Sequence, residues 1–147
     1  LVPTELEAEP LRGLPLEVAV IGMGPVEAGL TTLEILRQTR PYAELEQRRT
    51  FLTRSLQELF RERGIPVSIP GVGSLFSLFF RETPPRNLDE VRKSDANAYA
   101  RLFHALLEQG VYLAPSAFEA AFLSTAHETP VLEEALEGFR RALDAAF

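Results

Sequence analysis

Residues 42–59 carry apolar side chains at alternating intervals of three and four positions, with one arginine in the series. The positions are Tyr42, Leu45, Arg49, Leu52, Leu56 and Leu59. Only an α-helix brings residues three and four apart onto one face, so the spacing predicts one long helix with a narrow apolar seam. Pro41 precedes the seam, and Gly64 occupies a position typical of a helix C-terminus. Such a helix is stable when other elements cover its seam.

Two strand candidates follow this helix, at 65–69 and 74–80, and residues 70–73 between them have the composition of a tight turn. The second strand, SLFSLFF, alternates two sets of side chains that are both largely apolar. Both faces of the strand can therefore be buried. A connection this short favours antiparallel pairing.

Further elements precede and follow these, and the two later helices have recognisable end signals. We expect helices at 26–36, from Ser94 or Asp95 to Gly110, and from a Thr129 cap through Pro130 onward, a polar loop at 81–94, and short strands at 17–21, 111–114 and 120–125. This order predicts an α+β fold, with a small, mostly antiparallel sheet and helices packed on one face. Residues 1–24, rich in Pro and Glu, are predicted to be an irregular lead-in to a single domain at 25–147.

The composition excludes several classes of function. A net charge of −6 argues against a nucleic-acid partner, which requires a clustered positive field. No apolar run approaches the roughly 20 residues of a membrane helix, so no membrane partner is expected. The absence of cysteine excludes disulfides, thiolate metal sites and a cysteine nucleophile, and it suits a cytoplasmic location.

The stretch 114–127, APSAFEAAFLSTAH, places one carboxylate and one imidazole in a run that is otherwise small or apolar. A carboxylate in a buried segment is rare unless it is paired or functional, which makes Glu119 a candidate site residue. The alternative is a carboxylate that caps a turn at the rim of the sheet. His127 and His104 have no second ligand type beside them, so we expect structural roles for both and no metal site.

Four segments together resemble glutamate-1-semialdehyde 2,1-aminomutase, a fold-type-I enzyme family related to the class III aminotransferases. They are AGLTTLEIL at 28–36, VGSLFSLFF at 72–80, YARLFHALLEQG at 99–110 and GVYLAPSAFEAAFLSTAH at 110–127. The resemblance implies the C-terminal small domain of a homodimeric isomerase that uses pyridoxal 5′-phosphate (PLP). In this family the small domain closes over a cofactor held mainly by a large domain. The enzyme moves an amino group within a small amino-aldehyde and gives 5-aminolevulinate for tetrapyrrole synthesis.

The same resemblance suggests a role for Glu119. Relatives that accept ordinary α-amino acids typically grip the substrate carboxylate with an arginine from this domain. A carboxylate in that region would repel such a group and attract an ammonium, so Glu119 is predicted to bind substrate. Ser116 is predicted to support the loop. No residue of the chain is predicted to be catalytic, to hold the cofactor or to bind a metal.

A PLP enzyme needs a lysine that carries the cofactor, and Lys93 is the only lysine of the chain. It lies in the polar stretch VRKSD, without an apolar pocket to lower the pKa of its amine, so we expect no PLP on this chain and no activity from it alone. Two hypotheses remain open. The chain is either part of a working aminomutase or a truncated, non-catalytic homologue that serves dimerisation or interaction. A fragment of another class III aminotransferase is disfavoured by Glu119.

The resemblance also predicts what the apolar surfaces contact. In the family, the seam at 42–59 and the Phe-rich sheet would face a large domain or a second subunit. We therefore expect the isolated chain to expose an apolar patch and to self-associate. The Arg49 side chain, within the seam, is expected to bridge to a partner surface.

Overall fold

The computed structural model describes residues 25–147, in two compact units that divide after Arg40. The first unit contains α1, Pro25–Thr39, which confirms the helix predicted at 26–36 and is slightly longer. Leu30 and Leu33 of this helix are exposed. The predicted lead-in at 1–24 and the strand at 17–21 lie outside the described residues.

The second unit begins with α2, Tyr42–Glu62, the long helix predicted by the apolar seam. Its C-terminus is closed at Gly64, which has a φ of +65° and donates its N–H to the Arg61 carbonyl at 3.0 Å. The next N–H, of Ile65, donates to the Phe60 carbonyl at 3.0 Å. Glycine is favoured here because a side chain is strained at positive φ. The predicted helix end is confirmed.

The seam of α2 is buried within the second unit over most of its length. Leu52, Leu56 and Leu59 are at most 5% exposed and belong to the main core. Tyr42, at the N-terminal end, is 61% exposed. The expectation that a missing domain or subunit covers the seam is therefore wrong beyond its first turns, because α5, Thr129–Ala146, and the sheet of the same unit cover it.

The predicted β-hairpin is confirmed, but its turn is shorter than expected. Its strands are β1, Gly71–Val72, and β2, Leu75–Phe76, which pair antiparallel. A bridge between Ser68 and Phe79 continues the same register. The turn is therefore 73–74 rather than 70–73, and two residues predicted as turn belong to the strand.

Arg49 of α2 packs directly over this hairpin. Its Nε donates a hydrogen bond to the Gly73 carbonyl at 3.0 Å. A Cβ atom at Gly71 would lie 2.8 Å from Arg49 Cδ and 2.5 Å from the Leu75 carbonyl oxygen, so only glycine permits this close approach. The arginine thus binds its own hairpin, and the expectation that it bridges to a partner surface is wrong.

The third strand, β3, Ala121–Phe122, pairs antiparallel with β2 and gives the order β1-β2-β3. It lies within the strand predicted at 120–125. The strand predicted at 111–114 is wrong, because this segment joins no sheet. Instead, the Val111 N–H donates to the Leu106 carbonyl, and the Ala114 carbonyl accepts from the Tyr99 hydroxyl.

Helix α4, Ala96–Glu108, starts and ends as expected. The Asp95 carboxylate accepts from the Ala98 N–H at 2.9 Å, and Gly110 follows the last turn with a φ of +75°. The polar loop expected at 81–94 contains a short helix, α3, Leu88–Val91, which the Asn87 side chain caps through the Glu90 N–H. The Asn-x-x-Glu spacing is a capping-box pattern that could have indicated it.

Helix α5 begins one residue earlier than expected. Its N-cap is Glu128, which makes no capping hydrogen bond through its side chain, so Thr129 is the first helical residue rather than the cap. Pro130 therefore stands one position deeper in the first turn. The fixed φ of proline fits the first turn of a helix, so its presence alone does not determine the first residue.

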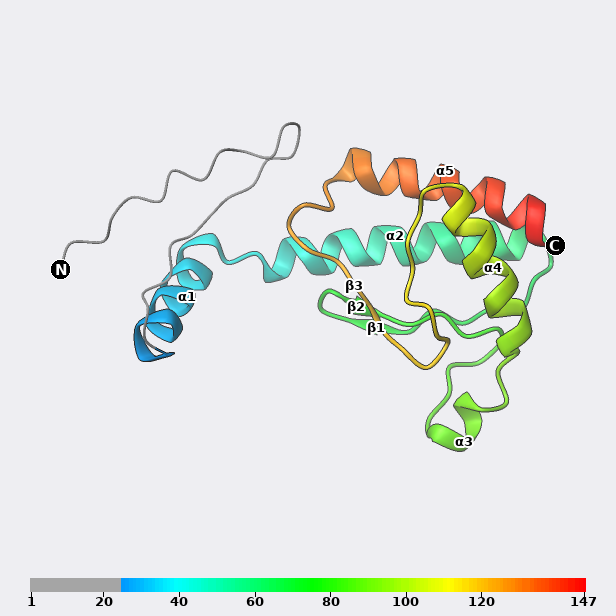
Figure 1. Ribbon diagram of the computed structural model, residues 1–147, viewed down its shortest axis with the longest axis horizontal. Helices are drawn as coiled ribbons and strands as arrows, with labels where there is room; N and C mark the ends of the chain where they lie inside the picture. The colour runs from blue at the N-terminus through cyan, green and yellow to red at the C-terminus, as the bar shows by residue number, and fades with distance from the viewer. Residues whose placement is uncertain (1–24) are drawn as a thin grey trace. The chain divides into compact units, whose positions relative to one another are not determined.

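The core lies between the helices and one face of the sheet. Helices α2 and α4 both pack against α5, and α2 also contacts β2 (Figure 1). The largest fully buried side chains are Leu56, Phe60, Leu102, Leu106, Leu132 and Leu143. Phe76 of β2 joins this cluster. The predicted α+β fold, a small antiparallel sheet with helices on one face, is confirmed.

The opposite face of the sheet presents an apolar row. Val72 pairs with Leu75, and Leu75 pairs with Phe122, so the three side chains lie side by side on the face opposite Phe76. Val72 is 72% exposed and Phe122 is 65% exposed. We call these three residues the outer row. Exposed apolar patches of this kind commonly mark contact surfaces.

The isolated 147-residue chain is expected to self-associate through the outer row. Replacing Phe122 with serine should weaken this association about tenfold or more, since burying a phenylalanine contributes about 1.5–3 kcal/mol. Sedimentation equilibrium measures the dissociation constant. Leu88→Ser is the matched control, because Leu88 is 55% exposed on α3 and outside the outer row. A wild-type chain that stays monomeric at the highest concentrations would contradict the expectation.

Candidate functional site

The candidate residue Glu119 lies in the loop that leads into β3. Ser116 organises this loop twice, because its Oγ accepts from the Phe118 N–H at 3.2 Å and its carbonyl accepts from the Glu119 N–H at 3.0 Å. Hydroxyl-to-backbone bonds of this type stabilise turns. Glu119 therefore stands on a hydrogen-bonded turn two residues before the first residue of β3.

The Glu119 side chain is exposed, although the composition of its segment suggests burial. Phe118 beside it is 58% exposed, whereas Leu123 farther along is 8% exposed. The segment is apolar because it supplies the outer row and part of the core, and its carboxylate stays in contact with water. An exposed carboxylate of this kind is available to a cationic group.

Tyr99 of α4 approaches the same loop from the core. It is 5% exposed, and its hydroxyl donates to the Ala114 carbonyl at 2.6 Å. Burial, and secondly the negative charge of Glu119, raise the pKa of Tyr99 to about 12. Tyr99, Glu119 and Ser77 line a void of about 10 Å³, which is near the minimum volume for one water.

The sequence places Tyr99 in the helix predicted to end at Gly110, but it does not indicate this contact. The available signal is chemical, since a buried tyrosine hydroxyl usually finds a hydrogen-bond partner. Its partner lies in a loop beyond the end of α4, so the helical pattern does not indicate which group it is.

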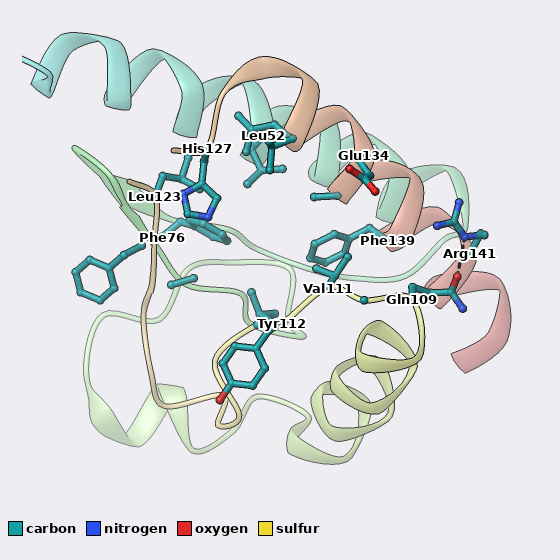
Figure 2. A pocket seen from close by; sticks show the side chains of 17 residues that line it. Leu52, Phe76, Gln109, Val111, Tyr112, Leu123, His127, Glu134, Phe139 and Arg141 are labelled. Atoms are coloured by element: carbon teal, nitrogen blue, oxygen red, sulfur yellow. Dashed lines mark hydrogen bonds between the residues drawn. The ribbon is translucent and has the colours of Figure 1, made fainter. Parts of the chain in front are cut away.

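A separate groove lies along α5, between residues 131 and 141 (Figure 2). It has a volume of about 340 Å³, and residues 109–113 and 121–123 also line it. Its wall is mainly apolar, with Leu132 and Phe139 from α5 and Tyr112 at the rim. On its polar side Arg141 Nε donates to Gln109 Oε1 at 2.7 Å. Glu119 does not line this groove, so the structure keeps the predicted site residue apart from it.

Both histidines have structural surroundings. His127 Nδ1 accepts from the Ser124 N–H at 2.9 Å and lies 3.0 Å from the Ser124 hydroxyl. The ring thus closes the turn before α5. His104 contacts the ring of Phe103 edge-on. In the part of the chain that the structure describes, no three His, Cys, Asp or Glu side chains are grouped as a metal site requires.

Among the described residues, no helix is both long enough and apolar enough to cross a lipid bilayer.

The residues present do not fit a bound PLP. A lysine that carries this cofactor requires surroundings that remove water from its amine and lower its pKa. Lys93 is exposed in the turn between α3 and α4. Its neighbour Arg92 is also exposed and pairs with Asp89 at 3.4 Å. The arrangement is that of a solvated charged surface.

Lys93 is therefore expected to form no specific adduct. The test is to incubate the 147-residue chain with PLP, reduce with borohydride and determine the mass of the product. We expect unmodified protein at PLP concentrations stoichiometric with the chain, because the Lys93 side chain is exposed on a charged surface that does not enclose a cofactor. Lys93→Arg supplies the control for background reduction. Complete labelling that the substitution abolishes would contradict the expectation.

No family model matches the chain. Curated relatives do match, over nearly all of its length. Glutamate-1-semialdehyde 2,1-aminomutase of Opitutus terrae is 40% identical over 138 residues, which are 94% of this chain and 31% of the relative. The same enzyme of Thermus thermophilus is 41% identical over 93% of this chain and 31% of its own length. The first alignment is longer than the described region, so it extends into residues 1–24.

Solved structures with a similar fold include an omega-transaminase from Sphaerobacter thermophilus, with a TM-score of 0.65 and 26% identity over 82% of this chain and 27% of its own. The FumI protein of Sphingopyxis, solved with PLP, has a TM-score of 0.63 and 30% identity over 82% of this chain and 26% of its own. These matches confirm the predicted resemblance and the predicted fold. The chain spans about 31% of the length of its curated relatives.

Proposed function

We propose that this relative of the glutamate-1-semialdehyde 2,1-aminomutases supplies the small domain of a PLP-dependent enzyme that makes 5-aminolevulinate for tetrapyrrole synthesis. The supporting observation is the 40–41% identity to two such enzymes over more than 90% of the chain. Since the chain spans 31% of those enzymes, the activity belongs to a larger assembly. The rest of that larger enzyme would supply the lysine that carries PLP and the cofactor-binding site.

Within this assembly, Glu119 is proposed to recognise the amine of the substrate. Its carboxylate is exposed, and the Ser116 turn fixes its backbone. A carboxylate stabilises a nearby ammonium through a charge-assisted hydrogen bond and repels another carboxylate. The domain would thereby favour substrates that present an amino group to it. A family member that grips an α-carboxylate needs an arginine instead.

The proposed assembly is a homodimer, as the aminomutase resemblance implies, and a cytoplasmic location suits a chain without cysteine. The chain carries an apolar surface suited to contact with the rest of such an enzyme, because the outer row is exposed on the sheet face opposite the core.

The experiment is a chimera of the Thermus thermophilus aminomutase in which this chain replaces the matching segment. We expect the chimera to bind PLP and to form 5-aminolevulinate from glutamate-1-semialdehyde, whereas the 147-residue chain alone forms none. A second chimera, with the corresponding Opitutus terrae segment, controls for damage at the junction. An inactive chimera beside an active control would refute the proposed function.

The second candidate is a non-catalytic homologue that only binds a subunit of such an enzyme. The exposed outer row supports it, because this surface can serve binding without any catalytic role. It predicts that the chain forms a stable complex with an intact aminomutase subunit while the chimera remains inactive. Sedimentation of the mixture and the chimera assay together distinguish the two candidates.

A further inference from the structure

The loop that carries Glu119 is held at both ends by rigid elements. At its start, the Ala114 carbonyl accepts the Tyr99 hydroxyl at 2.6 Å. At its end, Ala121 pairs with Phe76 of β2. Between these anchors, the Ser116 turn sets the backbone of Glu119. Without the first anchor, the chain between the buried Leu113 and β3 would lose its hydrogen bond to α4.

Tyr99 is itself well placed to act as an anchor. It lies in the first turn of α4, whose N-terminus is capped by Asp95 through the Ala98 N–H at 2.9 Å. Its ring is buried in the main core, so the hydroxyl has little freedom to move. A hydroxyl fixed in this way holds the Ala114 carbonyl, and with it the start of the loop, at a set position relative to α4. Packing of supporting residues commonly decides how well a binding group is oriented.

Tyr99 and Glu119 also lie near each other. Both line the same small void, and the Glu119 charge is close enough to help keep the phenol protonated. Throughout the neutral range the hydroxyl therefore remains a donor for the Ala114 carbonyl. Other residues that line the void include Ser77, which follows β2, and Leu113, which is buried.

We propose that Tyr99 is a positioning residue for substrate recognition, which holds the Glu119 loop in the geometry that receives the substrate amine. This inference rests on the proposed function and adds to it a residue that touches no substrate. Because Tyr99 acts through Glu119, its hydroxyl affects catalysis only while the Glu119 carboxylate is present. A tyrosine that served the core alone would act independently of Glu119.

A double-mutant cycle in the active chimera tests the inference. Tyr99→Phe keeps the ring and removes the hydroxyl, and it is expected to lower kcat/KM about 3- to 10-fold, the loss of one buried hydrogen bond. In the Glu119→Gln background the same substitution should change kcat/KM less than about twofold. Tyr112→Phe is the matched control, because that tyrosine is 74% exposed and its hydroxyl has no partner among the described contacts. Equal effects of Tyr99→Phe in both backgrounds would overturn the inference.

Hydrogen exchange of backbone amides in the isolated 147-residue chain, with and without Tyr99→Phe, gives a readout that does not depend on the chimera. The Glu119 amide donates to the Ser116 carbonyl, so its exchange reports the order of the loop. Tyr99→Phe is expected to speed this exchange about 2- to 10-fold while the amides of α4 keep their rates. If the chimera is inactive, the proposed function fails and this measurement still decides whether Tyr99 orders the loop. Unchanged exchange at Glu119 would refute the inference.

Discussion

Replacing Glu119 with glutamine in the chimeric aminomutase is expected to lower kcat/KM about 10- to 100-fold, because a hydrogen bond to a charged group contributes about 1.5–3 kcal/mol. Glutamine keeps the size of the side chain and an acceptor oxygen but loses the charge that attracts an ammonium. Steady-state kinetics with glutamate-1-semialdehyde measures the effect. The loss should weaken as the ionic strength rises, because the wild-type interaction is screened by salt at an exposed site.

The control for this substitution is Glu133→Gln in the same chimera. Glu133 is also an exposed glutamate, but it lies on α5, away from the loop. The Glu133→Gln substitution removes the same charge from the same domain. A change in kcat/KM that both variants share would therefore be a general electrostatic effect. If Glu119→Gln retained more than half of the wild-type kcat/KM, the proposed role of Glu119 would be excluded.

The elements that sequence analysis predicted correctly are those fixed by local chemistry. The seam at 42–59 predicts α2 because only a helix unites those positions, and Gly64 and Gly110 mark helix ends through their positive φ. Asp95 caps α4 through its own side chain. None of these signals depends on a distant part of the chain.

Two of the errors arose where the outcome depends on distant neighbours. Residues 111–114 have strand composition, but a strand forms only beside a partner, and here the segment is bonded to the Leu106 carbonyl and the Tyr99 hydroxyl instead. The seam has the pattern of a surface for another subunit, but it is covered by α5, which follows it by more than 60 residues. Periodicity shows that a face is buried without showing what buries it.

The candidate site likewise has one part that the sequence indicates and another that only the structure shows. Glu119 could be recognised from the sequence as an isolated carboxylate in an apolar run, and the structure then corrected its burial. The hydrogen bond from Tyr99 to Ala114 could not be predicted, since it joins a helix to a loop across the core. Local composition therefore identifies the charged group, whereas its orientation is a property of the tertiary fold.

Replacing Leu56 with alanine is expected to lower the free energy of unfolding of the 147-residue chain by about 2–5 kcal/mol, because the vacated space in a packed core is only partly refilled. Leu56 is fully buried and belongs to the cluster that joins α2, α5 and the sheet.

Urea denaturation followed by circular dichroism measures this loss. Leu107→Ala is the control, since Leu107 is a leucine of α4 that is 43% exposed, and it should cost less than about 1 kcal/mol. The comparison tests whether the seam is an internal core or a contact surface. A seam that served another subunit would change association and leave the unfolding of the single chain nearly unaltered. A loss as small as that of the control would therefore show that α5 does not hold α2 as the structure describes.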